Sequence, residues 1–413
     1  MLKYDSYILK NGLKVIVHQD RSTPIVAMNI IYKVGSRDEN PDRTGFAHLF
    51  EHLMFGGSLH IPKYDEPLQK AGGENNAFTN NDFTNYYLTI PKNNIETAFW
   101  LESDRMLSLA FSEKSLDIQR QVVVEEFKQN YLNQPYGDVY LLLKPLAYKK
   151  HPYQWNTIGK DISHIELATM NEVQTFYKKF YNPDNALLAI AGDVHPEEMY
   201  KLSEKWFGSI PRGEEIERNY PQEPHQEETR ELVVDRNVPQ SAVYMAWHMA
   251  SRTEDNFYRT DLISDVLSNG NSSRMYQNLV KKSKMFSDIS AFVTGDIDRG
   301  LFVVTGKLLN GATLQEAENL IYSELNNICR QPVLEEELKK INNKIEANLL
   351  FGRMSVLNKA MSLGYYEMLG SAQMLNNEIA RYHAVTRRDI QNTANEIFIE
   401  SKPSKLFYRA KSN

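Results

Sequence analysis

The chain has little cysteine and no long apolar run, and both absences narrow what it can be. Cys329 is the single cysteine among 413 residues, so neither an intramolecular disulfide nor a cysteine-based zinc cluster can form. No apolar segment approaches the roughly 20 residues that cross a bilayer. The N-terminal segment lacks the basic and apolar pattern of a signal peptide. We therefore expect a soluble protein from a reducing compartment, the cytoplasm.

The chain also has no excess of positively charged residues. Lysine and arginine number 47 against 53 aspartates and glutamates, which gives a formal net charge of −6. The chain as a whole therefore has no electrostatic footprint for nucleic acid or an acidic membrane. Hydrophobic residues make up 42% and aromatic residues 11%, which excludes a disordered chain. A length of 413 residues suffices for two or three domains with real cores.

Strand and helix patterns alternate along the first half. The pair Asn11-Gly12 between apolar runs predicts a hairpin with a type I′ turn. The other periodic segments are strand 25–34, helix 45–55, strand 85–90, a mostly helical stretch 94–131 and strand 186–190. This alternation predicts an α/β or α+β fold.

A charged, proline-containing stretch at 212–231 divides the chain almost in half. We interpret it as a solvated linker between an N-terminal domain, 1–211, and a C-terminal domain, 232–413; an acidic docking tail is the less favoured alternative.

The two halves resemble each other. Strand 26–32 aligns with 241–247, and helix 46–57 aligns with 259–270, each without an internal gap. In this alignment His48, Glu51 and His52 fall opposite Asp261, Ser264 and Asp265, so only the first half has a cluster typical of a metal site. The alignment predicts two homologous domains.

The sharpest motif is His48-Leu49-Phe50-Glu51-His52, inside the predicted helix. Residues four apart on a helix project from one face, so the two imidazoles can bind one divalent ion. Glu51 would place its carboxylate beside that ion, where a base for a water molecule is needed. The order is that of the inverzincin signature. A pair of hydrogen-bonded histidines on a helix face is the alternative interpretation.

The two histidines leave such a site one ligand short, because a catalytic zinc normally has three protein ligands and a water. Glu125 and Glu126 are adjacent carboxylates in the mostly helical stretch. Neighbouring residues of a helix point about 100° apart, so only one of them can face the ion. The residues themselves do not decide between the two, and a solvated helix carboxylate is the common alternative for each.

A third feature is the segment 72–88, in which turn formers lead into an aromatic, threonine-rich strand. An exposed edge of such a strand could accept a peptide by backbone pairing. A plain surface hairpin explains the same pattern equally well.

Together these motifs resemble peptidase family M16, which includes pitrilysin, insulin-degrading enzyme and the mitochondrial processing peptidase. The resemblance covers nearly the whole chain, whose length fits the half-size bacterial members. Besides the inverted motif and the strand at 72–87, it rests on segments 119–126, 151–153, 158–159, 181–186, 191–193 and 272–274.

The resemblance implies two homologous α+β domains, of the type found in LuxS and the mitochondrial processing peptidase, that form half of a clam-shell chamber. It implies Zn²⁺ as the cofactor, with His48 and His52 as ligands and Glu51 as the general base. It places the third ligand at Glu126 rather than Glu125. The implied activity is that of an endopeptidase that cleaves peptides or unfolded segments.

The resemblance also assigns contacts with the substrate. Asn76 matches a family asparagine near the scissile carbonyl and is a catalytic candidate. Ala77, Phe78 and Thr79 match the edge strand that pairs with the peptide. Asn80 follows them and completes the predicted substrate-binding stretch.

Two departures from the family pattern matter. Gln119 stands where the family usually has a glutamate that supports the metal ligands. Lys281 and Asp288 stand where active assemblies have an arginine and a tyrosine that bind the substrate. Lysine lacks the forked donors of arginine, and an aspartate has the wrong sign beside a developing oxyanion.

The second departure implies that the metal site and the arginine–tyrosine pair belong to two different chains. We expect a homologous, metal-less partner chain that has the arginine and tyrosine, with a homodimer as the other arrangement. The alternative function is a non-catalytic subunit of M16 type that binds peptides or serves as a scaffold. A purely structural zinc site is disfavoured, because structural zinc usually has four protein ligands.

Overall fold

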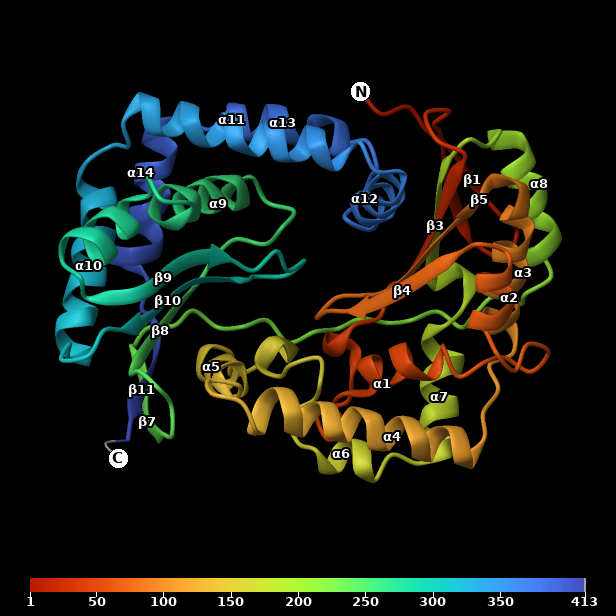
Figure 1. The fold of residues 1–413 in the computed structure, drawn as a ribbon, viewed down its shortest axis with the longest axis horizontal. Coiled ribbons are helices and arrows are strands. Elements are labelled where there is room, and N and C mark those ends of the chain that lie inside the picture. Colours follow the sequence, from red (N-terminus) through yellow and green to blue (C-terminus); the bar gives the residue numbers. More distant parts are fainter. Residues whose placement is uncertain (412–413) are drawn as a thin grey trace. The chain divides into compact units, whose positions relative to one another are not determined.

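The computed structural model describes residues 1–411, which form two compact units, each containing one β-sheet (Figure 1). The first unit comprises 1–128, 155–220 and 349–377. The second comprises 129–154, 221–348 and 378–413, of which the last two residues lie outside the description. Each unit therefore combines segments from both halves of the sequence.

The first unit contains a six-stranded sheet in the order β1-β2-β6-β3-β5-β4. Its strands are β1 Asp5–Ile8, β2 Lys14–Gln19, β3 Ile25–Tyr32, β4 Glu74–Thr79, β5 Thr84–Pro91 and β6 Ala186–Gly192. Its helices are α1 Phe46–Leu53, α2 Asp65–Lys70, α3 Ile95–Leu107, α4 Glu113–Phe127, α6 Ser163–Glu166, α7 Met170–Phe180, α8 Pro196–Phe207 and α12 Val356–Met368. Strand β4 lies at the end of this order, so its outer side is an edge of the sheet.

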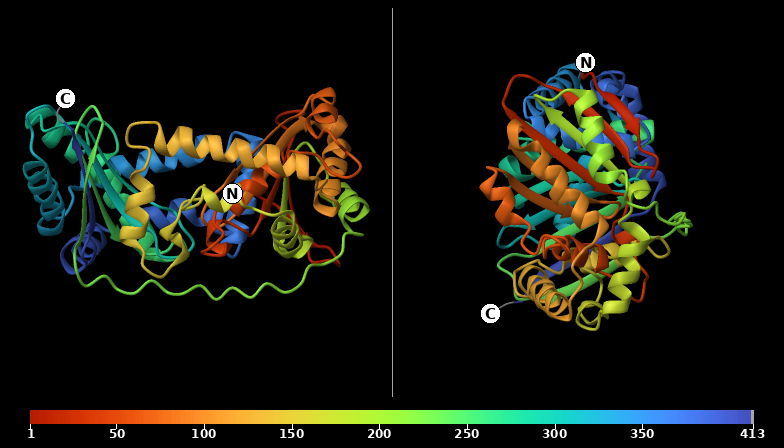
Figure 2. Two further views of the ribbon diagram at one scale, coloured as in Figure 1. Left: turned by 90° about the horizontal axis from the view of Figure 1, so that it is seen from below. Right: turned by 90° about the vertical axis from the view of Figure 1, so that its right-hand side faces the viewer.

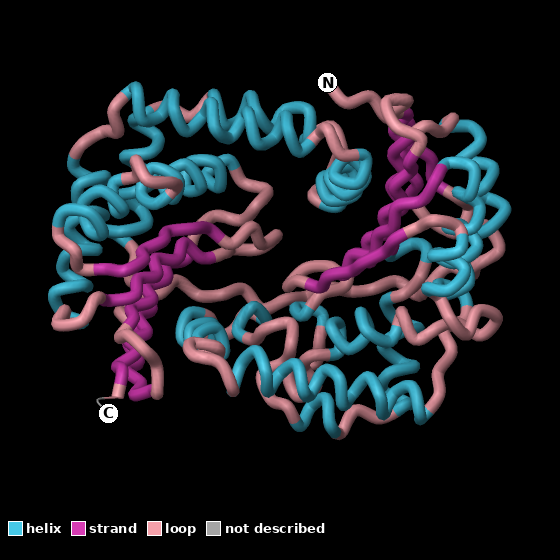
Figure 3. Tube along the Cα trace, in the orientation of Figure 1, coloured by secondary structure: helices cyan, strands magenta, loops and turns pink. Residues whose placement is uncertain are grey.

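The second unit contains a five-stranded sheet in the order β7-β11-β8-β10-β9. Figure 3 shows the strands of both units in magenta. Its strands are β7 Arg230–Arg236, β8 Ala242–His248, β9 Phe286–Val293, β10 Leu301–Leu308 and β11 Ser404–Ala410. Its helices are α5 Val139–Ala147, α9 Asp255–Ser268, α10 Leu314–Arg330 and α14 Arg387–Asn395. Helices α11, Glu335–Gly352, and α13, Met374–His383, have residues in both units.

The two sheets share one topology, which confirms the predicted repeat. Strand β2 is parallel to β6, and β7 is parallel to β11 in the same way. The remaining neighbours are antiparallel in both sheets, with β3 and β5 of the first corresponding to β8 and β10 of the second. Helix α1 follows β3 along the chain as α9 follows β8, as the sequence alignment of the halves requires.

A reciprocal exchange of helices was not apparent from the sequence. Helix α12 comes from the second half of the sequence but packs on β3 and β6 of the first sheet. Helix α5 comes from the first half but packs on β8 and β11 of the second sheet. Strands β3 and β6 correspond to β8 and β11. The sheet of the first unit is therefore covered by a helix from the second half of the sequence, and the equivalent strands of the second unit are covered by a helix from the first half.

The close packing of α12 on its sheet depends on small residues. Ala360 lies against Ala27 and Ala191 in one buried cluster. A Cβ atom at Gly364 would lie 3.0 Å from side-chain atoms of both Asn29 and Ile31, which are on β3. The opposite face of the first sheet is covered by α3 and α8 (Figure 1).

The first hairpin forms as predicted, but its turn is different. Strands β1 and β2 pair antiparallel, and the amide of Gly12 donates to the carbonyl of Leu9. Gly12 has a φ of 94°, whereas Asn11 is not at positive φ, so the type I′ prediction is wrong. The Asn11 side chain instead donates to the carbonyls of Phe207 and Ile210, at the end of α8.

The charged stretch forms neither helix nor strand up to β7 (Figure 2). Most of its residues are exposed. It is not solvated throughout, however. Glu223 is buried, and its carboxylate accepts hydrogen bonds from the amides of Lys149, Lys150 and His151. Among the described residues, none of the helices is both long and apolar enough to span a bilayer.

Candidate metal centre

Helix α1 is positioned by a buried glutamate that precedes it in the sequence. Its N-cap is Gly45, at a φ of 92°, where a Cβ would lie 2.8 Å from the side chain of Ile165. Glycine has no side chain to cap the helix. The buried carboxylate of Glu39 takes that role and accepts hydrogen bonds from the amides of Gly45 and Ala47, at 2.9 and 2.8 Å. The indole N–H of Trp155 is a third donor: it donates to Oε2 of Glu39 at 3.1 Å and so holds the Glu39 side chain in place.

The inner face of α1 anchors the helix. Phe46, Ala47, Leu49, Phe50 and Leu53 are buried. The ring of Phe50 stacks with those of Phe176 and Tyr181, at centroid distances of 5.0 and 5.1 Å. This packing leaves His48, Glu51 and His52 on the remaining surface of the helix.

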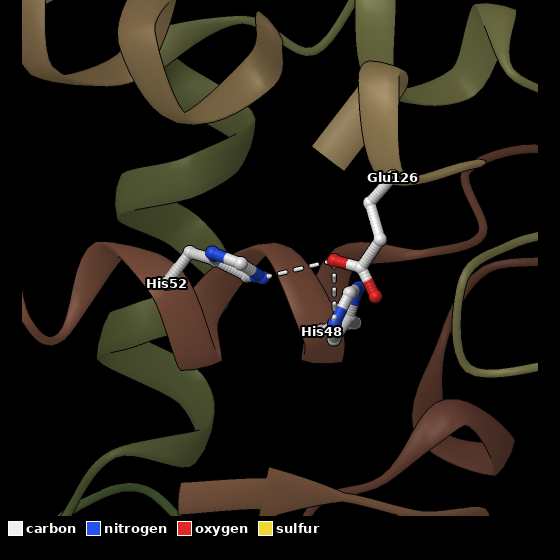
Figure 4. A group of neighbouring side chains, drawn as sticks. All are labelled: His48, His52 and Glu126. Carbon is white, nitrogen blue, oxygen red and sulfur yellow. Dashed lines mark ion pairs between the residues drawn. The ribbon is translucent and has the colours of Figure 1, made fainter. Parts of the chain in front are cut away.

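Three of the predicted site residues come together. The Nε2 atoms of His48 and His52 lie 3.7 and 3.5 Å from Oε2 of Glu126, the penultimate residue of α4 (Figure 4). One ligand atom from each residue lies within 4.8 Å of the others, and this is the one such group of metal-binding side chains in the described part of the chain. The structure therefore brings Glu126 to the histidines.

Glu125 does not take part. Its carboxylate is exposed and pairs with Lys128 at 2.7 Å. The two glutamates therefore point in different directions from α4, as adjacent helical residues do.

The three side chains fit a zinc ion. Zinc binds imidazole nitrogen and carboxylate oxygen at 2.0–2.2 Å, so a tetrahedral site separates its ligand atoms by roughly 3.4 Å. The nitrogen-to-oxygen distances of 3.5 and 3.7 Å are close to that spacing. Burial lowers the pKa of His48 to about 4, so its imidazole is neutral at pH 7 and able to bind a metal. With three side chains, a tetrahedral ion would keep one position for water.

Glu51 lies beside this group rather than within it. Burial raises the pKa of its carboxyl, and hydrogen bonds from Thr79 act in the opposite direction. The Thr79 hydroxyl donates to Oε2 of Glu51 at 2.7 Å. This bond connects the edge strand β4 directly to the motif on α1.

Part of the β4 backbone faces the outer edge of the sheet, away from β5. The amide of Asn80 donates to the carbonyl of Phe83, which fixes the alternation of hydrogen-bonded pairs along β4 and β5. In that alternation the backbone groups of Phe78 point to β5, whereas those of Ala77 and Thr79 point away from it. The outward-facing part of β4 is therefore centred on Ala77 and Thr79.

Two predicted substrate residues have local roles of their own. Asn76 is exposed, and its Oδ1 accepts from the Ala77 amide at 2.8 Å. Asn80 lies in the turn after β4, where its Oδ1 accepts from the amides of Asp82 and Phe83. Its carbonyl accepts from Ser36, so the Asn80 backbone is already engaged on both sides.

Gln119 lies on α4, about two turns before Glu126, and is partly buried. Within residues 1–411 its side chain makes no hydrogen bond to either histidine or to Glu126.

Comparison with models of known protein families shows which family this chain belongs to. The family model "Insulinase (Peptidase family M16)" matches residues 14–159, and "Peptidase M16 inactive domain" matches 168–345. The chain belongs to peptidase family M16. The His48–His52 motif lies in the first match, and the residues of the second match do not include it.

Relatives of this M16 chain extend over its full length. The zinc protease PqqE of Helicobacter pylori is 27% identical over 98% of this chain and 93% of its own. A probable mitochondrial-processing peptidase subunit beta of Schizosaccharomyces pombe is 24% identical over 96% and 89%. The crystal structure of a protease from Helicobacter pylori superposes with a TM-score of 0.95 at 26% identity, covering 99% of this chain and all of the other.

A longer neighbour has the same fold. The periplasmic protease PqqL from Escherichia coli is 16% identical, with a TM-score of 0.80 over 99% of the M16 chain. The match covers only 48% of PqqL, so this chain corresponds to about half of that protein's length.

The second half of the M16 chain has aspartates at the corresponding helix positions. Burial raises the pKa of both Asp261 and Asp265, to about 6 for Asp261. The Tyr382 hydroxyl donates to Asp261 at 2.6 Å, and Asn269 donates to Asp265. These carboxyls are thus held by neighbouring side chains.

Lys281 and Asp288, the second departure from the family pattern, lie at the surface of the second unit. Lys281 is exposed in the π-helical segment Tyr276–Lys282, and its ammonium lies 5.7 Å from the centre of the Tyr276 ring. Asp288 is exposed on β9, opposite Lys307 of β10.

Proposed function

We propose that this chain is the metal-bearing subunit of a zinc-dependent endopeptidase that cleaves peptides or unfolded segments. One observation carries the proposal: His48, His52 and Glu126 converge at zinc-binding distances, with Glu51 beside them. The names of its relatives, zinc protease and mitochondrial-processing peptidase, support the same conclusion.

Each residue has a defined role. His48, His52 and Glu126 would hold the zinc, which activates a water molecule and polarises the peptide carbonyl. The Glu51 carboxylate takes the proton of that water and later delivers it to the leaving amine. The Thr79 hydroxyl holds that carboxylate in place at 2.7 Å.

Strand β4 would bind the peptide by adding it as a further strand at the sheet edge. The outward-facing groups of Ala77 and the outward-facing carbonyl of Thr79 supply the backbone bonds, because the Thr79 amide is bonded to Glu51. A peptide that pairs with the Ala77 amide would replace Asn76 Oδ1 as its acceptor. The released Asn76 side chain could then turn its amide donors toward the developing oxyanion.

A homologous partner chain completes the proposed enzyme. Lys281 and Asp288 leave this chain without the arginine and tyrosine that the family uses on the substrate. Correspondence to half of the length of PqqL supports an assembly of two such chains around a chamber, either with a homologous partner or as a homodimer.

Cleavage of an unstructured peptide mixture, followed by mass spectrometry, tests the function. The zinc-loaded chain is assayed alone and with a co-purified homologue, with and without a chelator. We expect chelator-sensitive products, and a Glu51→Gln variant that keeps zinc but forms no products. Loss of zinc in that variant would show that base and ligand are misassigned, and no products in any arm would reject the function.

A non-catalytic peptide-binding or scaffold subunit is the second candidate. The departures at Lys281 and Asp288 favour it, as does the name of the family model over residues 168–345. It predicts about one zinc per chain and peptide binding without cleavage under every partner condition.

A further inference from the structure

The first unit contains an apolar cavity of about 200 Å³ on the sheet face covered by α12. It is lined by Ile31 of β3, by Phe78, Phe83 and Asn85 of the β4–β5 hairpin, and by Met361, Ser362 and Tyr365 of α12. The Phe83 ring lies 5.7 Å from that of Phe78 and 5.9 Å from that of Tyr365, so the walls are largely aromatic. Phe78 and the three α12 residues are only partly buried, so the cavity opens to the surface.

The cavity lies on the face of β4 opposite Glu51. Side chains alternate between the two faces of a strand, and the Thr79 side chain contacts Glu51. Phe78, one residue earlier, therefore projects to the other face, where it packs with Phe83 and Tyr365. The same alternation applies to any peptide strand added at the edge of β4, whatever its direction. A peptide residue across from Phe78 points its side chain to the face with the cavity.

The size and chemistry of the cavity match one aromatic ring. An apolar cavity of about 150 Å³ accommodates benzene, so about 200 Å³ is sufficient for a phenol. Asn85 is 1% exposed, and its Oδ1 finds no hydrogen-bond partner among residues 1–411. A ring with a hydroxyl or an N–H group would supply the missing donor.

We propose that this cavity, formed by β4, β5 and α12, is a subsite that binds one aromatic side chain of the peptide paired with β4. The proposal rests on the proposed function, because it needs a peptide at that edge. It makes Ser362 and Met361 residues that determine specificity, although both come from the second half of the sequence and lie on the opposite sheet face from Glu51.

Peptide binding to the zinc-loaded Glu51→Gln chain tests the subsite without cleavage. The probes are two glycine- and serine-based peptides, one with a single central tyrosine and its twin with alanine there. Fluorescence anisotropy gives the two dissociation constants, with a homologous partner added where the cleavage assay requires one. We expect the tyrosine peptide to bind about ten-fold more tightly, as burial of one aromatic ring allows.

Filling the cavity should remove this preference. In Ser362→Leu the added side chain occupies the space, so both peptides should bind equally and as weakly as the alanine peptide binds the parent. Asn358→Leu adds the same side chain on an exposed part of α12 outside the cavity and should keep the ten-fold difference. Circular dichroism checks that both variants are folded.

The outcomes separate the two proposals. Equal binding of both peptides to the parent, or an unchanged preference in Ser362→Leu, overturns the subsite even if the wild-type assembly cleaves peptides. A preference removed by Ser362→Leu but kept by Asn358→Leu supports the subsite even if no cleavage is found, in which case only the catalytic proposal fails.

Discussion

Thr79 donates a hydrogen bond from its hydroxyl to Oε2 of Glu51 at 2.7 Å. The bond ties a residue of the edge strand to the proposed general base on α1. In the proposed function, peptide binding along β4 and positioning of the Glu51 carboxyl would therefore depend on the same residue.

Thr79→Val should lower kcat roughly ten-fold while zinc content stays the same. Valine keeps the shape of threonine but removes the hydroxyl that orients Glu51, and loss of such an orienting bond costs about ten-fold or more. Thr79→Ser keeps the hydroxyl and should restore most of the rate. Thr89→Val, on the neighbouring strand β5, serves as the control. A parent-like kcat in Thr79→Val would show that Glu51 needs no support from the Thr79 hydroxyl.

Glu126→Gln should reduce zinc binding at least ten-fold, whereas Glu125→Gln should leave it unchanged. The first change removes the anionic ligand 3.5 Å from His52 Nε2, and the second only breaks an exposed pair with Lys128. Zinc is measured by competition with a chromophoric chelator. Equal affinities in the two variants would reject Glu126 as a ligand.

These two glutamates illustrate what the sequence could decide. Helical geometry showed that only one of Glu125 and Glu126 could face the ion, but the choice depended on how α4 is rotated against α1. That rotation is set by tertiary packing, which no local pattern reports. Only the resemblance to M16 peptidases gave Glu126, and the structure brings that residue to the histidines.

Local patterns predicted the repeat and most of the elements near the site, but they missed contacts distant in sequence. The exchange of α5 and α12 between the units was not predicted, because an apolar helix face does not reveal which sheet it covers. The cavity beneath α12 was missed for the same reason. The role of Glu39 was also missed, although a helix that starts at Gly45 without a capping side chain could have prompted a search for a distant one.

Glu39→Gln should lower the free energy of unfolding by about 2 kcal/mol and weaken zinc binding. Both carboxylate oxygens of Glu39 accept hydrogen bonds from buried N–H groups. A glutamine replaces one acceptor with an NH₂ group that faces another donor. Urea unfolding and zinc competition measure the two effects. Glu113→Gln, in the first turn of α4, is a control that should be nearly silent; an equally small effect of Glu39→Gln would exclude a positioning role for Glu39.

Asp261→Asn should stabilise the protein above pH 6 and change little at pH 4. Burial raises the pKa of Asp261 to about 6, from about 3.8 in the unfolded chain. Between these values the folded state binds a proton that the unfolded state has lost, so this carboxyl lowers stability as the pH rises through the window. Asparagine removes the titration and can still accept from Tyr382.

The expected gain from Asp261→Asn at pH 7 is about 3 kcal/mol in the free energy of unfolding. Urea unfolding at pH 4 and pH 7 measures it for parent and variant. Asp255→Asn changes an exposed aspartate at the start of the same helix and should show no such pH-dependent gain. A constant difference between parent and Asp261→Asn at both pH values would contradict the prediction.

The double variant Lys281→Arg/Asp288→Tyr should cleave peptides without a partner, at least ten-fold faster than the parent chain alone. Arginine supplies the forked donors that lysine lacks, and tyrosine replaces an anion by a hydroxyl donor suited to a developing oxyanion. Both positions are exposed, so the exchange should not disturb the fold. The matched control Lys282→Arg/Ser287→Tyr introduces the same residues next to these positions. Its rate should stay at the parent level, because the resemblance to M16 peptidases assigns no substrate contact to positions 282 and 287. A parent that cleaves alone as fast as the double variant would show that Lys281 and Asp288 impose no defect, and the requirement for a partner with arginine and tyrosine would then be rejected.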